Sequence, residues 1–238
     1  MTSLRALQEL SGRAQGFGGD LRYGQTGPGA GLRGADLICE AIAERSMPGA
    51  RAKQWRAFLS VTDGGSGQAV HAIERIGSGP WYDRLGRLVA NGLSELPYDR
   101  PQSAHVAIRN DLPNEDGVPN HAPDPTAGQV DNHHMLTGSN AQGRLYGSTA
   151  TCLDWTSARG DRTTEGRLRV GLSWPRGGGG GGGGGGGMAG SANWISSLDE
   201  AGCGAGVSLT EMGPPVLSNP TVGSGGGYGG FYCFALVP

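Results

Sequence analysis

The sequence predicts one compact α+β domain held together by disulfides, and three observations support this prediction. A single clear amphipathic helix is followed by several short strand-like runs. Glycine contributes 47 of the 238 residues, which indicates a loop-rich chain with few long helices. The cysteines are an even set without C-x-x-C spacing, which favours two disulfides over a structural zinc site.

The four cysteines, Cys39, Cys152, Cys203 and Cys233, permit three pairings, and their spacing does not choose among them. Four buried free thiols in a cytosolic protein are the alternative. Disulfides indicate an extracellular or cell-surface protein, whereas Met1–Arg5 is not followed by the apolar core of a signal peptide. The route of export therefore stays open.

Charge and hydropathy disfavour two classes of partner. A formal net charge of -2 and a charged fraction of 17% leave no broad basic surface for nucleic acid or anionic lipid. No stretch approaches the roughly 20 apolar residues that span a bilayer. We therefore expect neither nucleic-acid binding nor membrane insertion.

The chain is predicted to begin with a polar arm and to continue as one domain. Residues 1–19 form the arm, which has one weak helical stripe of leucines, and residues 20–238 form the domain. The unbroken glycine run 177–187 buries no side chain and loses much entropy on ordering, so it is predicted to be a flexible insertion. A structure that forms only with a partner is the alternative.

The clearest element is a helix over Ala35–Arg45, where Ala35, Ile38, Cys39 and Ile42 lie on one face. The proline-rich stretch 97–131 is predicted to be a long loop. Two helical turns are expected at 69–76, and strands are expected at 20–23, 54–61, 81–83, 87–89, 134–137, 168–172 and 231–236.

Gly29–Gly34 match the dinucleotide-binding pattern G-x-G-x-x-G and precede the predicted helix. No strong apolar strand leads into the motif, and no alternating strands and helices follow to build a parallel sheet. The glycines are therefore interpreted as a bend and not as a nucleotide site.

No pattern in the sequence indicates catalysis. There is no G-x-S-x-G elbow and no cysteine–histidine signature of an active site. His133 and His134 are neighbours on a predicted strand, so their side chains are expected on opposite faces, one at the surface and one packed. The five tryptophans are interpreted mainly as core residues, with sugar stacking as the alternative.

Oxygen ligands gather in the proline-rich loop. Asn114, Glu115, Asp116 and Asp131 are the candidates for calcium or ligand contacts, because calcium prefers carboxylate and amide oxygens. The stretch lacks the spacing of an EF-hand, and a solvated acidic loop is the alternative. No other cofactor is indicated.

Six pieces of sequence, in fixed order, match one known family. They are Gly34–Cys39, Trp55–Ser60, Arg87–Asn91, Leu136–Gly143, Cys152–Thr156 and Tyr232–Cys233. Together they resemble the endostatin-like domains, a branch of the C-type-lectin-like folds, over most of the chain. The resemblance implies a mainly antiparallel sheet, one or two short helices, long loops and two nested disulfides, Cys39 with Cys233 and Cys152 with Cys203.

Two features of the animal members of this family do not carry over. Their zinc site uses histidines near the start of the domain, and this chain has no histidine before His71. Their arginine-rich heparin surface is also not evident. The resemblance therefore implies the fold more than the ligand.

The sequence favours an extracellular lectin-like recognition or adhesion domain, non-catalytic, that binds a glycan or protein ligand. The loop 97–131 and the glycine-rich bends are the expected contact regions. The alternative is a structural subunit of an extracellular or cell-surface filament, fibre or matrix, in which the glycine run and the N-terminus contact neighbouring copies.

Overall fold

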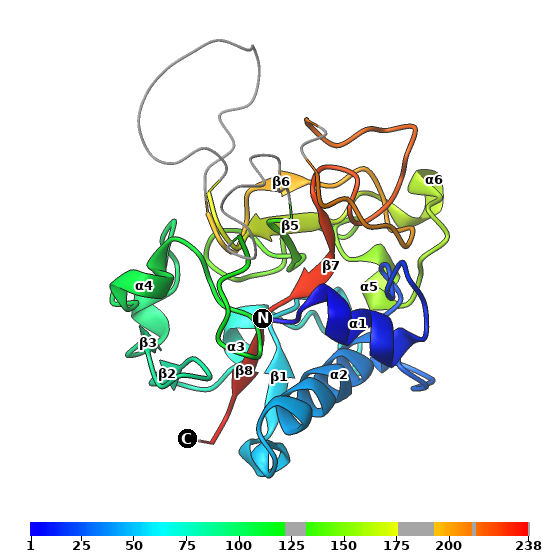
Figure 1. Cartoon of the computed structure of the whole chain (residues 1–238). Coiled ribbons are helices and arrows are strands. Elements are labelled where there is room, and N and C mark those ends of the chain that lie inside the picture. Colours follow the sequence, from blue (N-terminus) through cyan, green and yellow to red (C-terminus); the bar gives the residue numbers. More distant parts are fainter. Residues whose placement is uncertain (122–131, 176–192, 211–212, 238) are drawn as a thin grey trace.

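The computed structural model describes residues 1–121, 132–175, 193–210 and 213–237. The fold is mixed α+β, with small and mainly antiparallel sheets and two disulfides, as predicted. Figure 1 shows α2 (Ala30–Ser46) on one side of the molecule and a four-stranded sheet on the other. The glycine run 177–187 and Asp131 lie outside the described residues.

The other helices are α1 (Leu4–Ser11), α3 (Ala72–Arg75), α4 (Val106–Arg109), α5 (Cys152–Trp155) and α6 (Arg162–Glu165), with 3₁₀ turns η1 (Ala50–Lys53) and η2 (Leu93–Glu95). The strands are β1 (Trp55–Ala57), β2 (Trp81–Tyr82), β3 (Leu88–Ala90), β4 (His134–Leu136), β5 (Arg169–Leu172), β6 (Leu198–Asp199), β7 (Gly227–Phe231) and β8 (Cys233–Ala235). Helices are thus more numerous than the one or two expected, and the extra ones, α3 to α6, are short turns of four residues each.

Three sheets organise the strands. The largest has the order β6-β5-β4-β7, and its pairs are antiparallel except for the parallel pair β4–β7. The strands β2 and β3 form the predicted hairpin, and β1 pairs with β8. In Figure 1 the chain leaves the large sheet along β7 and continues into β8, so these last strands connect the two halves of the molecule.

Helix α2 begins earlier than predicted, because the chain turns at Gly29 with φ 71 and enters the helix at Ala30. Its buried face includes Ile38, Cys39 and Ile42, as the periodicity predicts. A Cβ on Gly31 would lie 2.0 Å from the Asp154 carbonyl oxygen, so Gly31 lets α2 approach α5 closely. The G-x-G-x-x-G glycines thus serve packing as well as the bend.

The disulfides join Cys39 to Cys233 and Cys152 to Cys203, the nested pairing that the resemblance implies. The outer bond clips α2 to β8, and the inner bond attaches α5 to the segment that follows β6. Loops of these lengths correspond to about 5 and 4 kcal/mol in the chain-entropy model. The two bonds thus fix segments from both ends of the sequence to one core.

The first 19 residues belong to the folded domain and are not a polar arm. Ala6 and Leu7 of α1 are buried in the same core as α2, and the Thr2 N–H donates to the Phe231 oxygen at 3.0 Å. An ion pair between Glu9 and Arg45 also joins α1 to α2. The leucine stripe is short, but it covers apolar surface that the sequence alone does not reveal.

Two predicted strands are shorter in the structure. The run 54–61 pairs with β8 only over Trp55–Ala57, and the buried backbone beyond it bonds to several different partners instead of one ladder. The run 20–23 forms a single bridge, from Asp20 to Thr156. Local sequence indicates extended, buried chain correctly in 54–61, but the neighbours decide whether a ladder forms.

The described helices include none with both the length and the apolar character needed to cross a membrane. The longest, α2, has 17 residues and carries charged side chains along one face.

Candidate functional site

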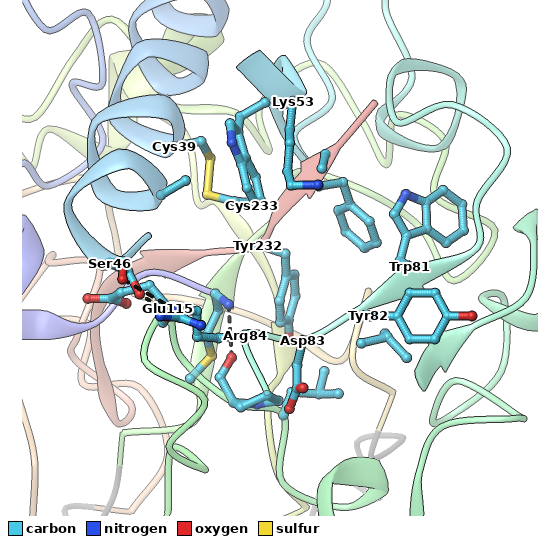
Figure 2. Close-up of a pocket in the computed structure, with 18 of the residues that line it drawn as sticks. Cys39, Ser46, Lys53, Trp81, Tyr82, Asp83, Arg84, Glu115, Tyr232 and Cys233 are labelled. Carbon is cyan, nitrogen blue, oxygen red and sulfur yellow. Dashed lines mark hydrogen bonds between the residues drawn. A yellow bond between two sulfur atoms is a disulfide. The ribbon is translucent and has the colours of Figure 1, made fainter. Parts of the chain in front are cut away.

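A pocket of about 430 Å³ lies between the second half of α2, strand β8, the β2–β3 hairpin and residues 112–115. Figure 2 shows the Cys39–Cys233 disulfide on one side, Trp81 and Tyr82 on the other, and the Tyr232 ring between them. This volume lies within the range of typical small-ligand pockets. We refer to it below as the aromatic pocket.

Aromatic side chains form the walls of the aromatic pocket. Trp81 packs edge-on against Phe234 with ring centroids 5.3 Å apart, and Trp194 packs edge-on against Tyr232 at 4.9 Å. Trp55, opposite Ala235 in the β1–β8 ladder, adds a further ring. The indole of Trp55 is held in place because its N–H donates to the Ala50 oxygen at 2.7 Å.

Tyr232 lines the aromatic pocket, but its hydroxyl is buried within the protein and closed to solvent. Its side chain is only 4% exposed, and no described residue offers its hydroxyl a hydrogen-bond partner. Burial raises the pKa of Tyr232 well above its usual value, so the hydroxyl keeps its proton at neutral pH. A buried polar group without a partner costs folding free energy of about 1–3 kcal/mol.

The two carboxylates of the aromatic pocket are already occupied. Asp83 accepts hydrogen bonds from Arg87 at 2.6–2.7 Å and from the backbone N–H of Leu85 at 3.0 Å. Glu115 accepts from the Ser3 hydroxyl at 2.5 Å and lies 3.7 Å from an Arg45 nitrogen. These carboxylates are therefore neutralised by partners within the protein.

The two cationic side chains of the aromatic pocket are not paired with a described carboxylate. Lys53, the only lysine of the sequence, forms no ion pair with any described residue. Arg84 makes one long hydrogen bond, 3.4 Å from its Nε to the Ser46 oxygen, and no described carboxylate lies within ion-pair distance. The unpaired charge of the pocket is thus positive.

The predicted ligand residues divide between the pocket and the surface. Asn114 and Glu115 line the aromatic pocket, whereas Asp116 is exposed and lies outside the lining. The Asn114 side-chain oxygen accepts from the N–H groups of Asp116 and Val118, so it closes a turn. Asp131 is outside the described residues.

Within 1–121, 132–175, 193–210 and 213–237, no three His, Cys, Asp or Glu side chains gather in a way that could hold a metal ion. Calcium also accepts amide and backbone oxygens, so calcium or ligand contacts at Asn114, Glu115 and Asp116 stay a prediction. Calcium binding that involves Asp131 stays a prediction.

The histidine pair differs from expectation, since both residues are buried. His133 and His134 pack edge-on with ring centroids 4.3 Å apart, and His134 Nδ1 lies 2.5 Å from Glu200 Oε1. Glu200 also accepts from the Gly225 N–H at 3.1 Å. The chain is buried on both faces here, so opposite orientation does not bring either ring to the surface. Glu200, which contacts both His134 and Gly225, connects the glycine-rich bend to β4.

Apart from Asn114, Glu115 and the Cys39–Cys233 pair, the sequence does not predict the residues that line the aromatic pocket. Its clearest members, Lys53, Trp81, Arg84 and Tyr232, come from three separate parts of the chain. One signal was present: the implied bond between Cys39 and Cys233 places Tyr232 beside α2. No local sequence pattern predicts that the β2–β3 hairpin lies opposite the Cys39–Cys233 disulfide.

The chain has no match among protein-family models or among curated proteins. Its function is therefore argued from the aromatic pocket alone.

Proposed function

We propose that this chain is a non-catalytic recognition domain that binds a glycan or protein ligand in the aromatic pocket. The observation that carries the proposal is the aromatic pocket itself, a cavity of about 430 Å³ with aromatic walls and with two cationic side chains, Lys53 and Arg84, that pair with no described carboxylate. Concave and mostly apolar sites with a few polar groups are typical of ligand binding.

The location we propose is extracellular or at the cell surface. Two disulfides support it, since such bonds persist in oxidising compartments. We also propose that the fold is endostatin-like, within the C-type-lectin-like class. The nested disulfides, with the outer one joining the long helix to the last strand, support this assignment.

The proposal is tested by filling the aromatic pocket. Ala235 is half-buried on β8 and lines the pocket, so Ala235→Trp places an indole inside it. The purified protein is applied to glycan and peptide microarrays, with and without EDTA. We expect ligands on one array to bind and Ala235→Trp to weaken binding at least about tenfold. Sensitivity to EDTA would report calcium.

A second pair of variants distinguishes a loss of binding from misfolding. Tyr82 is 58% exposed at the pocket, so Tyr82→Ala removes a ring with little effect on the core. Tyr98 is 45% exposed and lies outside the pocket lining, so Tyr98→Ala is the matched control. We expect only Tyr82→Ala to weaken binding. Equal binding by wild type, Ala235→Trp and Tyr82→Ala would contradict the proposal.

A further inference from the structure

We infer that the ligand of the aromatic pocket is a segment of a partner protein in which an apolar side chain is flanked by carboxylates. This inference rests on the proposed function and narrows it to one ligand class. The hydrogen-bonding inventory of the pocket, its unpaired charge and its apolar rim carry the inference.

Several side chains of the aromatic pocket have donors that no described residue engages. They are the Trp81 indole N–H, the Lys53 ammonium and the terminal nitrogens of Arg84. None of these three groups accepts a hydrogen bond at neutral pH, so together they favour a ligand that supplies acceptors.

A neutral sugar uses this inventory only in part. Its hydroxyls donate as well as accept, and they carry no charge to meet Lys53 and Arg84. The carboxylates Asp83 and Glu115 already accept from Arg87, Leu85 and Ser3. A neutral sugar would therefore leave the two cationic side chains of the pocket unpaired.

The unpaired charge selects an anion. Arg87 neutralises Asp83 and Arg45 lies beside Glu115, whereas Lys53 and Arg84 pair with no described carboxylate. In Figure 2 Lys53 and Arg84 lie on different sides of Tyr232. Carboxylates on both sides of an apolar group would meet these cations, while the apolar group fills the aromatic centre.

The rim of the aromatic pocket favours a protein over a small metabolite. Tyr82 is 58% exposed, and Leu85, at the turn of the same hairpin, is 62% exposed. Val237, which lines the pocket next to β8, is 43% exposed. Apolar surface that continues beyond a pocket is typical of protein interfaces, where tyrosine, tryptophan and arginine provide most of the binding free energy.

The experiment compares acidic peptides with their amides. Synthetic hexapeptides that carry Asp or Glu on both sides of Trp, Phe or Leu are paired with copies in which Asn or Gln replaces the acid. Affinity for the full chain is measured by fluorescence polarisation. We expect the acidic peptides to bind at least about tenfold more tightly than the amides, and high salt to reduce the difference.

Matched variants test whether Lys53 and Arg84 cause the preference for acidic peptides over their amides. Lys53→Gln with Arg84→Gln is expected to remove the preference for acid. The control, Arg13→Gln with Arg162→Gln, removes the same net charge from exposed side chains outside the pocket and is expected to preserve it. Loss of the preference in the control as well would overturn the inference, because a long-range field and not the pocket would then select the anion.

The single lysine supplies an independent readout. After reductive ¹³C-methylation, Lys53 gives the one ε-amine signal of the chain, and we expect an acidic peptide, not its amide, to shift it. Peptides and amides that bind equally, or a glycan that binds while peptides do not, would overturn the inference but leave the proposed function standing, provided that Ala235→Trp abolishes binding. A chain that binds neither peptides nor the glycan array overturns both.

Discussion

Two buried tyrosines, four positions apart, differ in how their hydroxyl groups are satisfied. Tyr228 donates to the Thr2 oxygen at 2.9 Å and lies 3.2 Å from Asn120 Oδ1, whereas Tyr232 has no partner among the described residues. Burial raises the pKa of both phenols, so both keep their protons at neutral pH. The folded protein thus carries at Tyr232 a buried hydroxyl without a hydrogen-bond partner among the described residues.

Replacement of each tyrosine by phenylalanine should have opposite effects on stability. We expect Tyr232→Phe to raise the free energy of unfolding by about 1 kcal/mol, because it removes an unsatisfied buried hydroxyl. Tyr228→Phe should lower it by about 1–2 kcal/mol, because it leaves acceptors unpaired. Urea unfolding of the three proteins measures both effects. A loss of stability in Tyr232→Phe similar to that in Tyr228→Phe would show that its hydroxyl is satisfied.

At the scale of elements, the contact between α2 and α5 depends on the absence of a side chain. Residues Cys152–Trp155 all have positive φ angles of 52–62°, so α5 is a left-handed turn, a conformation that costs about 1–2 kcal/mol per residue. The Asp154 carboxylate stabilises it by accepting from the N–H groups of Thr62 and Asp63 at 2.7 and 3.0 Å. The turn places the backbone carbonyl oxygen of Asp154 against α2.

Gly31→Ala tests this contact. The new Cβ would lie 2.0 Å from the Asp154 oxygen and 2.8 Å from the Trp155 oxygen, both backbone atoms that cannot move without shifting the turn. We expect the free energy of unfolding to fall by about 3 kcal/mol or more. Gly147→Ala, where nothing lies within 4 Å and φ is not positive, should be neutral or slightly stabilising.

The comparison of these two alanine variants by thermal unfolding separates packing from helix propensity. Alanine is the better helix former, so propensity alone would make Gly31→Ala stabilising. A rise in melting temperature for Gly31→Ala would therefore refute the close approach of α2 and α5.

At the scale of the whole molecule, pH changes the stability of the fold through carboxylates with shifted pKa values. Backbone N–H groups of Gly49 and Arg51 lower the pKa of Glu44, and those of Gly65 and Gly67 lower the pKa of Asp63. A lowered pKa stabilises the folded state above the unfolded value of about 4, and the effect is lost as pH falls through the folded pKa.

Some buried carboxylates act in the opposite direction. Desolvation raises the pKa of Asp36 and of Asp111, so each favours the folded state less as pH rises through its folded value. The dependence of stability on pH therefore combines contributions of opposite sign. A variant that removes only the carboxylates with lowered pKa values isolates their contribution.

Glu44→Gln with Asp63→Asn is that variant. We expect it to be less stable than the wild type at pH 7, and we expect the deficit to shrink as pH falls through the lowered folded pKa values of the two carboxylates. Urea midpoints at several pH values from 7 downward measure the difference. A difference that stays constant with pH would mean that the two side chains act through packing and not through their charge.

The helix α2 shows how much of the fold is predictable from local pattern. Ala35, Ile38, Cys39 and Ile42 recur at helical spacing, and all four are buried. The pattern places the start of the helix five residues late, because the first turns of α2 include Gly31 and Gly34, which disfavour helices in isolation. Packing of these glycines against α5 and the chain at Leu21–Arg22 supplies what propensity lacks.

The candidate site is predictable only in part. Asn114 and Glu115, chosen from the sequence for their oxygen atoms, do lie on the pocket wall, but Glu115 is held by Ser3. The segment that includes Ser3 was itself predicted to lie outside the domain. An acidic pattern shows which atoms are present, and only the fold shows which of them are already bonded.

The sequence by itself determined the α+β class, the inward face of α2, the β2–β3 hairpin and, through the family resemblance, which cysteines pair. These depend on local periodicity, turn residues and ordered motifs, which short segments carry. Tertiary structure alone decided that Lys53, Arg84 and Tyr232 line one cavity and that the Tyr232 hydroxyl is buried without a partner among the described residues. Such a meeting depends on long-range packing and desolvation, because neither is a property of any single segment.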